Sequence, residues 1–509
     1  MNHELPLEPS FPLRIVHNEM WFSFLQSASR PTAFVVFLAA LCMVPGSQRA
    51  FAESKPQALS NSASVIVNPG VPVPQFNVDP TPAVCVIGDS ITHGGAYHAN
   101  VFLFYATRFP HRELHMFNCG ISGDTAAGVI RRLDWDVLSH KPSAATVLLG
   151  MNDAGSKHYL RDDEKSKEAR QPAIEKYAAN LTNLVEELRK AKVRVTLLTP
   201  TIYEQNADTG TPNWLGYNDA LRLCGEEVKK VAKQFDLPVI DVHSAMNAVN
   251  EAAQRDDPKF TLVGRDRVHP GSLGHMVIAY VMLMAQEMPS LVSKTVVAAD
   301  SSKVTEQVNA KVTQLKISPT ELSFDCLESA LPFPLPAGAQ GVLKLVPFQK
   351  NLNQELLKVT GLADGKYTLT IDDQTVGQFD AAELAFGINL ADNTKTPQYQ
   401  QALVVESLNA KRHKLESIRL RGIAATEVFL RNSGKMNDPQ AVSEMVLRAS
   451  GWKPEMDKAV PSDRVNNIFD AYRKYKPVEK ELLNEVEQTR AEMYKAAQPK
   501  LHRFFLKKN

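Results

Sequence analysis

The feature that most constrains the fold lies between about residues 81 and 290, where short apolar runs alternate with longer segments of helical periodicity. The runs are five or six residues long and rich in β-branched side chains, which is typical of strands buried on both faces. Such strands, separated by helices, form a parallel sheet covered by helices on both sides. The sequence therefore predicts a three-layer α/β/α sandwich. The expected strands are 83–87, 113–118, 144–149, 193–198 and 238–241, and the expected helices are 97–108, 124–139, 170–191, 216–235 and 272–287.

The remainder of the chain has a different pattern. With 509 residues the chain is longer than one hydrophobic core supports, so we expect more than one domain. A hairpin signal, Asp364-Gly365, lies among alternating runs and indicates a small antiparallel β-rich module, whereas the segments after it have helical periodicity. The predicted organisation is a signal peptide at 1–52, a linker at 53–80, the α/β domain at 81–290, a helical or irregular connector at 291–311, the β-rich module at 312–395 and a C-terminal helical region at 396–509.

The first fifty residues have the features of an export signal. The apolar run from Ala33 to Val44 is shorter than the ~20 residues that a membrane-spanning helix requires. Ala50-Phe51-Ala52 then gives the small-x-small pattern of a cleavage site. We therefore expect a bacterial-type signal peptide, a periplasmic or secreted protein, and no stable membrane span after cleavage. An uncleaved membrane anchor is the alternative.

Charge, cysteine and histidine patterns exclude several classes of partner. The chain has 57 Lys and Arg against 56 Asp and Glu, a formal net charge of +1, so no global field attracts nucleic acid. Cys85 and Cys119 lie within or at the end of apolar runs and are expected to be buried small hydrophobes. His111 and His115 have a spacing that would place both on one helix face, but they straddle a loop and an expected strand without a third ligand. No metal site is expected, and the oligomeric state is left open.

Four polar segments lie at the ends of predicted strands or on loops, and each carries a residue type that ester hydrolysis needs. Ser90 can stand at the start of a helix with its hydroxyl exposed, although capping that helix is the more ordinary role for a serine. Asp266 lies three residues before His269 and can hydrogen-bond Nδ1, which leaves Nε2 to take a proton from serine. Taken alone, this loop could equally be half of a metal site. The segments are Gly88-Asp89-Ser90, Gly120-Ile121-Ser122-Gly123-Asp124, Gly150-Met151-Asn152-Asp153 and Asp266-Arg267-Val268-His269-Pro270.

The remaining two segments supply hydrogen-bond donors. Ester cleavage places negative charge on the carbonyl oxygen, and preorganised donors stabilise that charge. Gly123 and Ser90 can offer backbone N–H groups, and Asn152 can offer its side-chain amide. A turn glycine and an Asx-turn asparagine are the ordinary explanations for these residues taken singly. Four unrelated structural roles for four segments in this order along the chain are less plausible than one shared role in ester hydrolysis.

These motifs resemble those of the SGNH (GDSL-type) hydrolase family, over about residues 81–290. The resemblance implies that Ser90 is the nucleophile, that His269 is the base oriented by Asp266, and that Gly123 and Asn152 complete the oxyanion hole with Ser90. One departure is Met151, where many members carry a smaller residue. The four histidines at 93, 98, 111 and 115 are expected to be surface or packing residues, and the three aspartates at 89, 124 and 153 are expected to brace their loops.

The resulting functional expectation is an exported serine esterase that acts through a Ser-His-Asp triad and an acyl-enzyme, without a cofactor or metal. We expect a small-molecule or glycan ester as substrate, with a preference for O-acyl (acetyl) carbohydrate suggested by export, the neutral charge and the β-rich module. Within the family that the motifs resemble, lipid and aryl esters are also common substrates. The alternatives are therefore a lipase or lysophospholipase-type enzyme, an aryl esterase, a carbohydrate O-acyltransferase and a non-catalytic binding protein.

Overall fold

A parallel sheet lies at the centre of the α/β unit, with the strand order β2-β1-β3-β4-β5. The structure is a computed structural model that describes residues 71–79, 82–450 and 468–509, so the predicted signal peptide and most of the predicted linker lie outside the described residues. Continuous apolar runs form the strands, and their residues are almost all buried. The strands are β1 (Ala83–Gly88), β2 (His115–Gly120), β3 (Ala144–Leu148), β4 (Arg194–Leu198) and β5 (Val239–Ile240).

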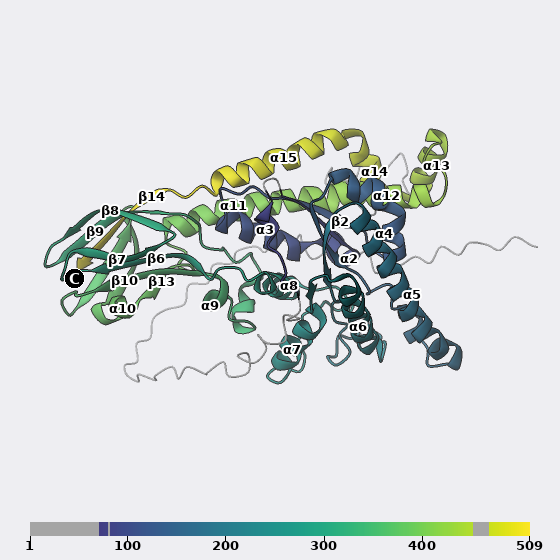
Figure 1. Cartoon of the computed structure of the whole chain (residues 1–509), viewed down its shortest axis with the longest axis horizontal. Coiled ribbons are helices and arrows are strands. Elements are labelled where there is room, and N and C mark those ends of the chain that lie inside the picture. Colours follow the sequence, from purple (N-terminus) through teal and green to yellow (C-terminus); the bar gives the residue numbers. More distant parts are fainter. Residues whose placement is uncertain (1–70, 80–81, 451–467) are drawn as a thin grey trace, which may run out of the picture.

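Helices cover both faces of this sheet, which confirms the predicted three-layer α/β/α fold (Figure 1). Helices α3 and α8 pack together on one face, and α4, α5 and α6 pack side by side on the other. The predicted helix 124–139 is shorter than expected, because a π-helical turn at Leu133–Val137 and a 3-10 turn at Leu138–His140 follow α4. The helices are α2 (Ser90–Gly94), α3 (Ala96–Arg108), α4 (Ala126–Arg132), α5 (Glu164–Lys190), α6 (Tyr217–Phe235), α7 (Val242–Gln254) and α8 (Ser272–Ala285).

Two further sheets pack face to face as a β-sandwich at the other end of the molecule (Figure 1). Their strand orders are β13-β10-β6-β7 and β12-β11-β14-β9-β8. Buried apolar side chains of both sheets, such as Leu357 from the first and Phe324 from the second, form one core. The strands are β6 (Leu291–Ala298), β7 (Lys303–Val308), β8 (Ala310–Ile317), β9 (Glu321–Glu328), β10 (Gln354–Thr360), β11 (Lys366–Ile371), β12 (Gln374–Asp380), β13 (Ile388–Asn389) and β14 (Leu501–Lys508).

Three details of the expected secondary structure after residue 290 are wrong. The segment 291–311, expected to be helical or irregular, forms β6, β7 and the start of β8, and Val297 of β6 packs into the sandwich core. The hairpin expected at Asp364-Gly365 is absent from the described strands, since β10 and β11 belong to different sheets; the tight turn lies instead at Asp372 and Asp373, both with positive φ. Residues 501–508, expected to be helical, form β14, whose apolar side chains alternate into the sandwich core.

The helical segment, which we define as residues 397–450 and 468–496, connects the two ends of the molecule. Its long helices α11 and α15 pack against each other, and α11 also packs against α3 of the α/β unit (Figure 1). A π-helical turn at Leu415–Leu420 joins α11 to α12 without a break. The chain leaves the sandwich after β13 and returns to it as β14, so the sandwich holds the helical segment at both ends. The helices are α11 (Pro397–Lys414), α12 (Arg421–Asn432), α13 (Pro439–Ser450), α14 (Ile468–Tyr475) and α15 (Glu479–Ala496).

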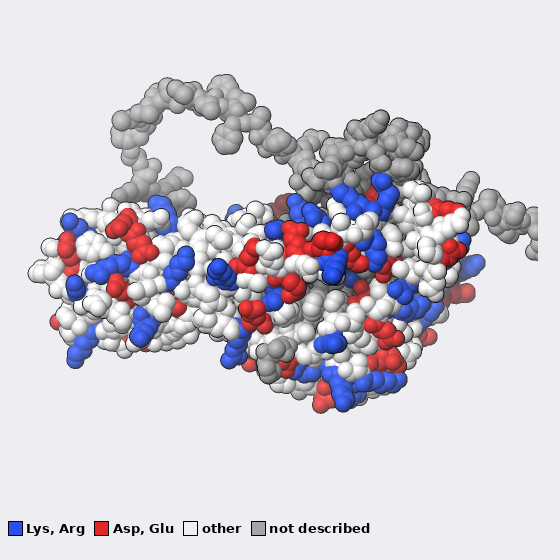
Figure 2. Space-filling view, turned by 90° about the horizontal axis from the view of Figure 1, so that it is seen from above, with Lys and Arg blue, Asp and Glu red and all other residues white. Residues whose placement is uncertain are grey.

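Surface charge and cysteines agree with the sequence analysis. On the face shown in Figure 2, basic and acidic side chains are interspersed over both ends of the molecule. The four cysteines among the described residues are buried and unpaired, Cys85 and Cys119 among them. None of the described helices combines the length and the apolar character needed to cross a membrane.

Candidate active site

Ser90 is the first residue of α2, directly beyond the carboxyl end of β1. The preceding residue, Asp89, caps this helix by accepting a hydrogen bond from the backbone N–H of Ile91. Ser90 therefore has no capping role, and its half-buried hydroxyl lies 2.7 Å from Nε2 of His269. The ordinary capping role that the sequence allows for Ser90 is thus filled by Asp89.

The loop before α8 holds His269 through Asp266. Oδ2 of Asp266 accepts a hydrogen bond from Nδ1 of His269 at 2.7 Å, and Oδ1 accepts from the backbone N–H groups of Val268 and His269 at 3.0 Å each. One carboxylate thus shapes the turn and orients the imidazole, leaving Nε2 as the acceptor toward Ser90. Burial acts to raise the pKa of Asp266, but the hydrogen bonds from His269 and the backbone outweigh it and keep this pKa below its ordinary value.

Arg267 also holds the loop that carries His269. It adopts a left-handed conformation, with φ of 67°. Its buried guanidinium donates to the carbonyl oxygens of Glu204 and Ala207, at 2.9 Å each, and its own carbonyl oxygen accepts from the N–H of Glu204 at 2.9 Å. These bonds join the His269 loop to the loop after β4. The sequence analysis missed this role, because no local pattern distinguishes a buried arginine from a surface one.

The β2–α4 loop, residues 121–125, carries Gly123 at the same edge of the sheet as Ser90. In the sheet, Gly88 lies opposite Gly120 and Leu148, so the residues that follow β1, β2 and β3 gather at one edge. Gly123 has a φ of 77°, and no atom lies within 4 Å of where its Cβ would be. Among the hydrogen bonds of the described residues, none engages the backbone N–H of Gly123 or of Ser90. Both groups are therefore open toward a ligand.

Asn152 lies in the turn after β3 and bonds to the β2–α4 loop. Its amide Nδ2 donates to the carbonyl oxygen of Asp124 at 2.9 Å, which uses one of its two N–H groups. Ser90, Gly123, Asn152, Asp266 and His269, predicted from four separate segments, thus come together at the carboxyl edge of the sheet.

Three buried or half-buried carboxylates brace these loops, as the sequence analysis expected. Asp153 accepts a hydrogen bond from the backbone N–H of Ala126 at 3.0 Å, and Asp124 forms an ion pair with Arg132 at 2.7 Å. Burial raises the pKa of Asp89 to about 6 and the pKa of Asp153 to about 7, and the charges of nearby carboxylates add to both shifts. The low-dielectric surroundings of the site are evident in these shifts.

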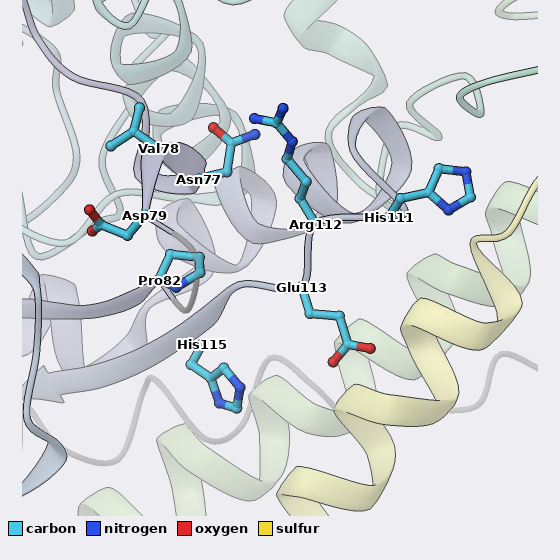
Figure 3. Close-up of a pocket in the computed structure, with 8 residues that line it drawn as sticks. All are labelled: Asn77, Val78, Asp79, Pro82, His111, Arg112, Glu113 and His115. Carbon is cyan, nitrogen blue, oxygen red and sulfur yellow. The ribbon is translucent and has the colours of Figure 1, made fainter.

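Other aromatic and histidine side chains lie away from the site or serve packing. Tyr203 and Trp214 stack at 5.4 Å between ring centroids, within the loop after β4. His111 and His115 line a hollow of about 600 Å³, where their rings point away from each other (Figure 3). This hollow lies at the amino ends of β1 and β2, the edge opposite Ser90. Within the described part of the chain, no group of three His, Cys, Asp or Glu side chains is placed to hold a metal ion.

Comparison with known proteins identifies the family. Residues 86–277 match the GDSL-like lipase/acylhydrolase family. The chain is similar to an acetylxylan esterase of Geobacillus stearothermophilus, with 26% identity over 216 residues, which is 39% of this chain and 90% of that protein. A solved structure of an acetylxylan esterase from the same organism has 25% identity, covers 40% of this chain and 93% of that chain, and has a TM-score of 0.33.

A second solved structure is similar over most of the chain. It is a gut microbial diltiazem-metabolizing enzyme with 32% identity and a TM-score of 0.78, covering 86% of this chain and 100% of that one. This similarity extends beyond the α/β unit, because the unit alone is a much smaller part of the chain. The chain therefore belongs to the GDSL-like lipase/acylhydrolase family, and it is a carboxylic ester hydrolase.

Proposed function

We propose that this hydrolase is an exported serine esterase in which Ser90 is the nucleophile, His269 the general base and Asp266 the residue that orients the base. The observation that carries the proposal is the continuous hydrogen-bonded series from Ser90 Oγ through His269 to Asp266, with both distances 2.7 Å. A serine hydroxyl is a weak nucleophile at its ordinary pKa, and an adjacent base activates it. The export signal and the catalytic roles belong to the proposal.

The geometry supports a two-step acyl transfer. Ser90 Oγ attacks the ester carbonyl while Nε2 of His269 takes the hydroxyl proton. The carbonyl oxygen becomes an oxyanion, which the N–H groups of Ser90 and Gly123 and the amide of Asn152 stabilise. The bond to the alcohol breaks as His269 returns the proton to the leaving oxygen, and the acyl group remains on Ser90. Water, deprotonated by His269, then releases the acid and restores the serine.

We favour O-acetylated carbohydrate as the substrate class. The similarity to an acetylxylan esterase supports an acetyl ester of a sugar. The side chain of His269 is 30% exposed and Ser90 is half-buried, so a bulky alcohol has access to the reacting atoms from solvent. Diltiazem, which carries an O-acetyl ester, is a second informative substrate because of the similar diltiazem-metabolizing enzyme.

The first experiment compares p-nitrophenyl acetate hydrolysis by the wild type, Ser90→Ala and Ser143→Ala. Ser143 is a matched control, because it lies just before β3 at the opposite edge of the same sheet, where its hydroxyl donates to Ala83. We expect Ser90→Ala to fall to the background rate and Ser143→Ala to keep wild-type activity. Equal rates for Ser90→Ala and the wild type would overturn the proposal.

A substrate panel then decides the class of ester. Acetylated xylo-oligosaccharides, diltiazem, p-nitrophenyl octanoate and a lysophospholipid are compared by kcat/KM, with free sugar added as a possible acceptor. We expect the acetyl esters to be preferred and the product to be free acetate. Preference for the long-chain substrates would favour a lipase-type enzyme, and acetylated acceptor sugar would favour an acyltransferase.

A further inference from the structure

An ion pair connects two π-helical turns that lie far apart in the chain. One, Leu133–Val137, lies in the α/β unit and carries Asp136; the other, Leu415–Leu420, lies in the helical segment and ends where Arg421 begins α12. π-Helical turns are rare and occur frequently at functional sites. The two turns are joined by Arg421 and Asp136, which are 285 residues apart in the chain.

Arg421 and Asp136 form a buried, bidentate ion pair. The two guanidinium nitrogens Nη1 and Nη2 donate to the two carboxylate oxygens at 2.7 and 2.9 Å. The side chains are 6% and 5% exposed. Burial opposes ionisation of Asp136, but the charges and hydrogen bonds of Arg421 and Arg132 hold its pKa well below the ordinary range. Burying such charges is unfavourable unless every group is well paired, so this pair depends on accurate geometry.

The same two arginines hold both ends of the β2–α4 loop. Nε of Arg421 donates to the carbonyl oxygen of Gly120 at 3.0 Å, at the start of the loop. Arg132 donates from Nε to Asp124 at 2.7 Å, near the end of the loop, and from Nη1 to Asp136. Gly123 lies between these two attachment points. The position of its N–H therefore depends on a network that includes a residue of the helical segment.

His93 makes a second connection between the loop and the helical segment. Its Nδ1 accepts a hydrogen bond from the backbone N–H of Ser122 at 3.2 Å, and its Nε2 donates to the carbonyl oxygen of Ser417 in the π-helical turn at 3.1 Å. Burial lowers the pKa of His93 to about 3, so the ring stays neutral and keeps one tautomer. This bond fixes the Ile121–Ser122 peptide group, which directly precedes the peptide group that carries the Gly123 N–H.

We infer that the helical segment is a structural part of the esterase site and that Arg421 is a positioning residue, which holds the β2–α4 loop so that the Gly123 N–H meets the developing oxyanion. This inference rests on the proposed function, because it assigns Arg421 a role in the step that Ser90 begins. Arg421 acts through the loop and has no hydrogen bond to Ser90 or His269 among those of the described residues. Its loss therefore affects the transition state more than substrate binding.

The test compares Arg421→Lys and Arg421→Met with Arg412→Lys. Lysine keeps a positive charge for Asp136 but lacks the planar fork needed to reach Asp136 and Gly120 together. Arg412 is the matched control, since it is also buried in the same helical segment, pairs with Glu416 of the π-helical turn at 2.7 Å and lies over the Phe102 ring at 4.1 Å, while its hydrogen bonds go to Glu416 and Asn409 and not to the β2–α4 loop. Thermal unfolding of each variant sets an assay temperature at which all of them are folded.

We expect kcat to fall roughly 10- to 100-fold in both Arg421 variants, because a small displacement of an oxyanion donor has effects of this size. We expect KM to change less than about twofold and the pH midpoint of kcat/KM to stay the same. Arg412→Lys lowers the melting temperature and keeps the wild-type kcat. If Arg421→Met fails to fold, Arg421→Lys alone decides the test.

Two results would overturn this inference. One is a wild-type kcat in a folded Arg421→Lys protein, and the other is an equal loss of kcat in Arg412→Lys, which would indicate general loosening of the helical segment. Ser90→Ala separates this inference from the proposed function. If Ser90→Ala keeps its activity, the proposed function is wrong. If Ser90→Ala is inactive and the Arg421 variants are fully active, only the role of Arg421 is wrong.

Discussion

Nε2 of His269 lies 2.7 Å from Oγ of Ser90, although 179 residues separate them in the chain. The parallel sheet makes this possible, because β1 delivers Ser90 to the same edge at which the loop before α8 delivers His269. Helices α3 and α8, which follow Ser90 and His269 along the chain, pack against each other. The packing of these two helices therefore supports the contact between Ser90 and His269.

Asp266→Asn should lower kcat/KM by roughly 10³- to 10⁴-fold. An amide keeps the size of the carboxylate, but it can donate to Nδ1 of His269 and so stabilise the tautomer with the proton on Nε2, which cannot accept from Ser90. Steady-state kinetics with p-nitrophenyl acetate measure the loss, and circular dichroism checks that the fold is intact. A loss smaller than about tenfold in a folded variant would contradict the orienting role of Asp266.

Asn152→Ala should lower kcat by roughly 10²- to 10³-fold and change KM little, because the amide acts mainly on charge that develops in the transition state. The variant also loses the hydrogen bond to the carbonyl oxygen of Asp124. Separate kcat and KM values for an acetyl ester test the prediction. A raised KM with the wild-type kcat would instead assign Asn152 to ground-state binding of the substrate.

Glu355→Gln should stabilise the protein at pH 8 and have less effect at pH 4. Glu355 is 2% exposed in the sandwich, and neither carboxylate oxygen has a hydrogen-bond partner among the described residues. Burial, assisted by the charge of Glu328, raises the pKa of Glu355 well above its ordinary value. The folded state therefore favours the protonated acid, and stability falls as the pH rises from the unfolded-state pKa toward the folded-state pKa.

Melting temperatures of the wild type and Glu355→Gln across this pH range measure the effect. Because glutamine does not ionise, its advantage should grow from pH 4 to pH 8. A constant difference between the two proteins over the whole range would show that folding does not raise the pKa of Glu355.

Gly120→Ala should destabilise the fold by about 1–3 kcal/mol. A methyl group at Gly120 would lie on the backbone nitrogen of His93, well inside van der Waals contact, so α2 would have to move away from the sheet. Gly271→Ala is the control, because nothing lies within 4 Å of its Cβ position and its φ is −75°. Urea unfolding of both variants gives the free energies. Equal stability of the two variants would contradict close packing of α2 on β2.

The sequence predicts the α/β unit well because its information there is local. The strands are short, mostly apolar runs, and the residues of the proposed triad and oxyanion hole lie in short motifs at strand ends or on loops. Ser90, for example, is recognised from its immediate neighbours and from the order of the other motifs. The sheet topology then brings these motifs together without further information.

The contacts of the helical segment and the strands of the sandwich depend on residues that are far apart in the chain. Such contacts leave no local pattern in the sequence. Nothing in the residues around Arg421 indicates that it pairs with Asp136, or that His93 links the β2–α4 loop to Ser417. The valines of 291–298 become a strand only because the sandwich provides a surface to bury them. Tertiary contacts thus decide these elements, and propensity alone gives the wrong result.

The position of β14 determines the order in which this molecule can fold. It lies between β11 and β9, and Thr368 bonds to Asn509, 141 residues further along the chain. Until that distant strand has been synthesised, β9 and β11 expose unpaired backbone edges, which are prone to intermolecular pairing. Closing so long a loop is also slow. The second sheet of the sandwich therefore cannot form completely until residues 501–508 are present.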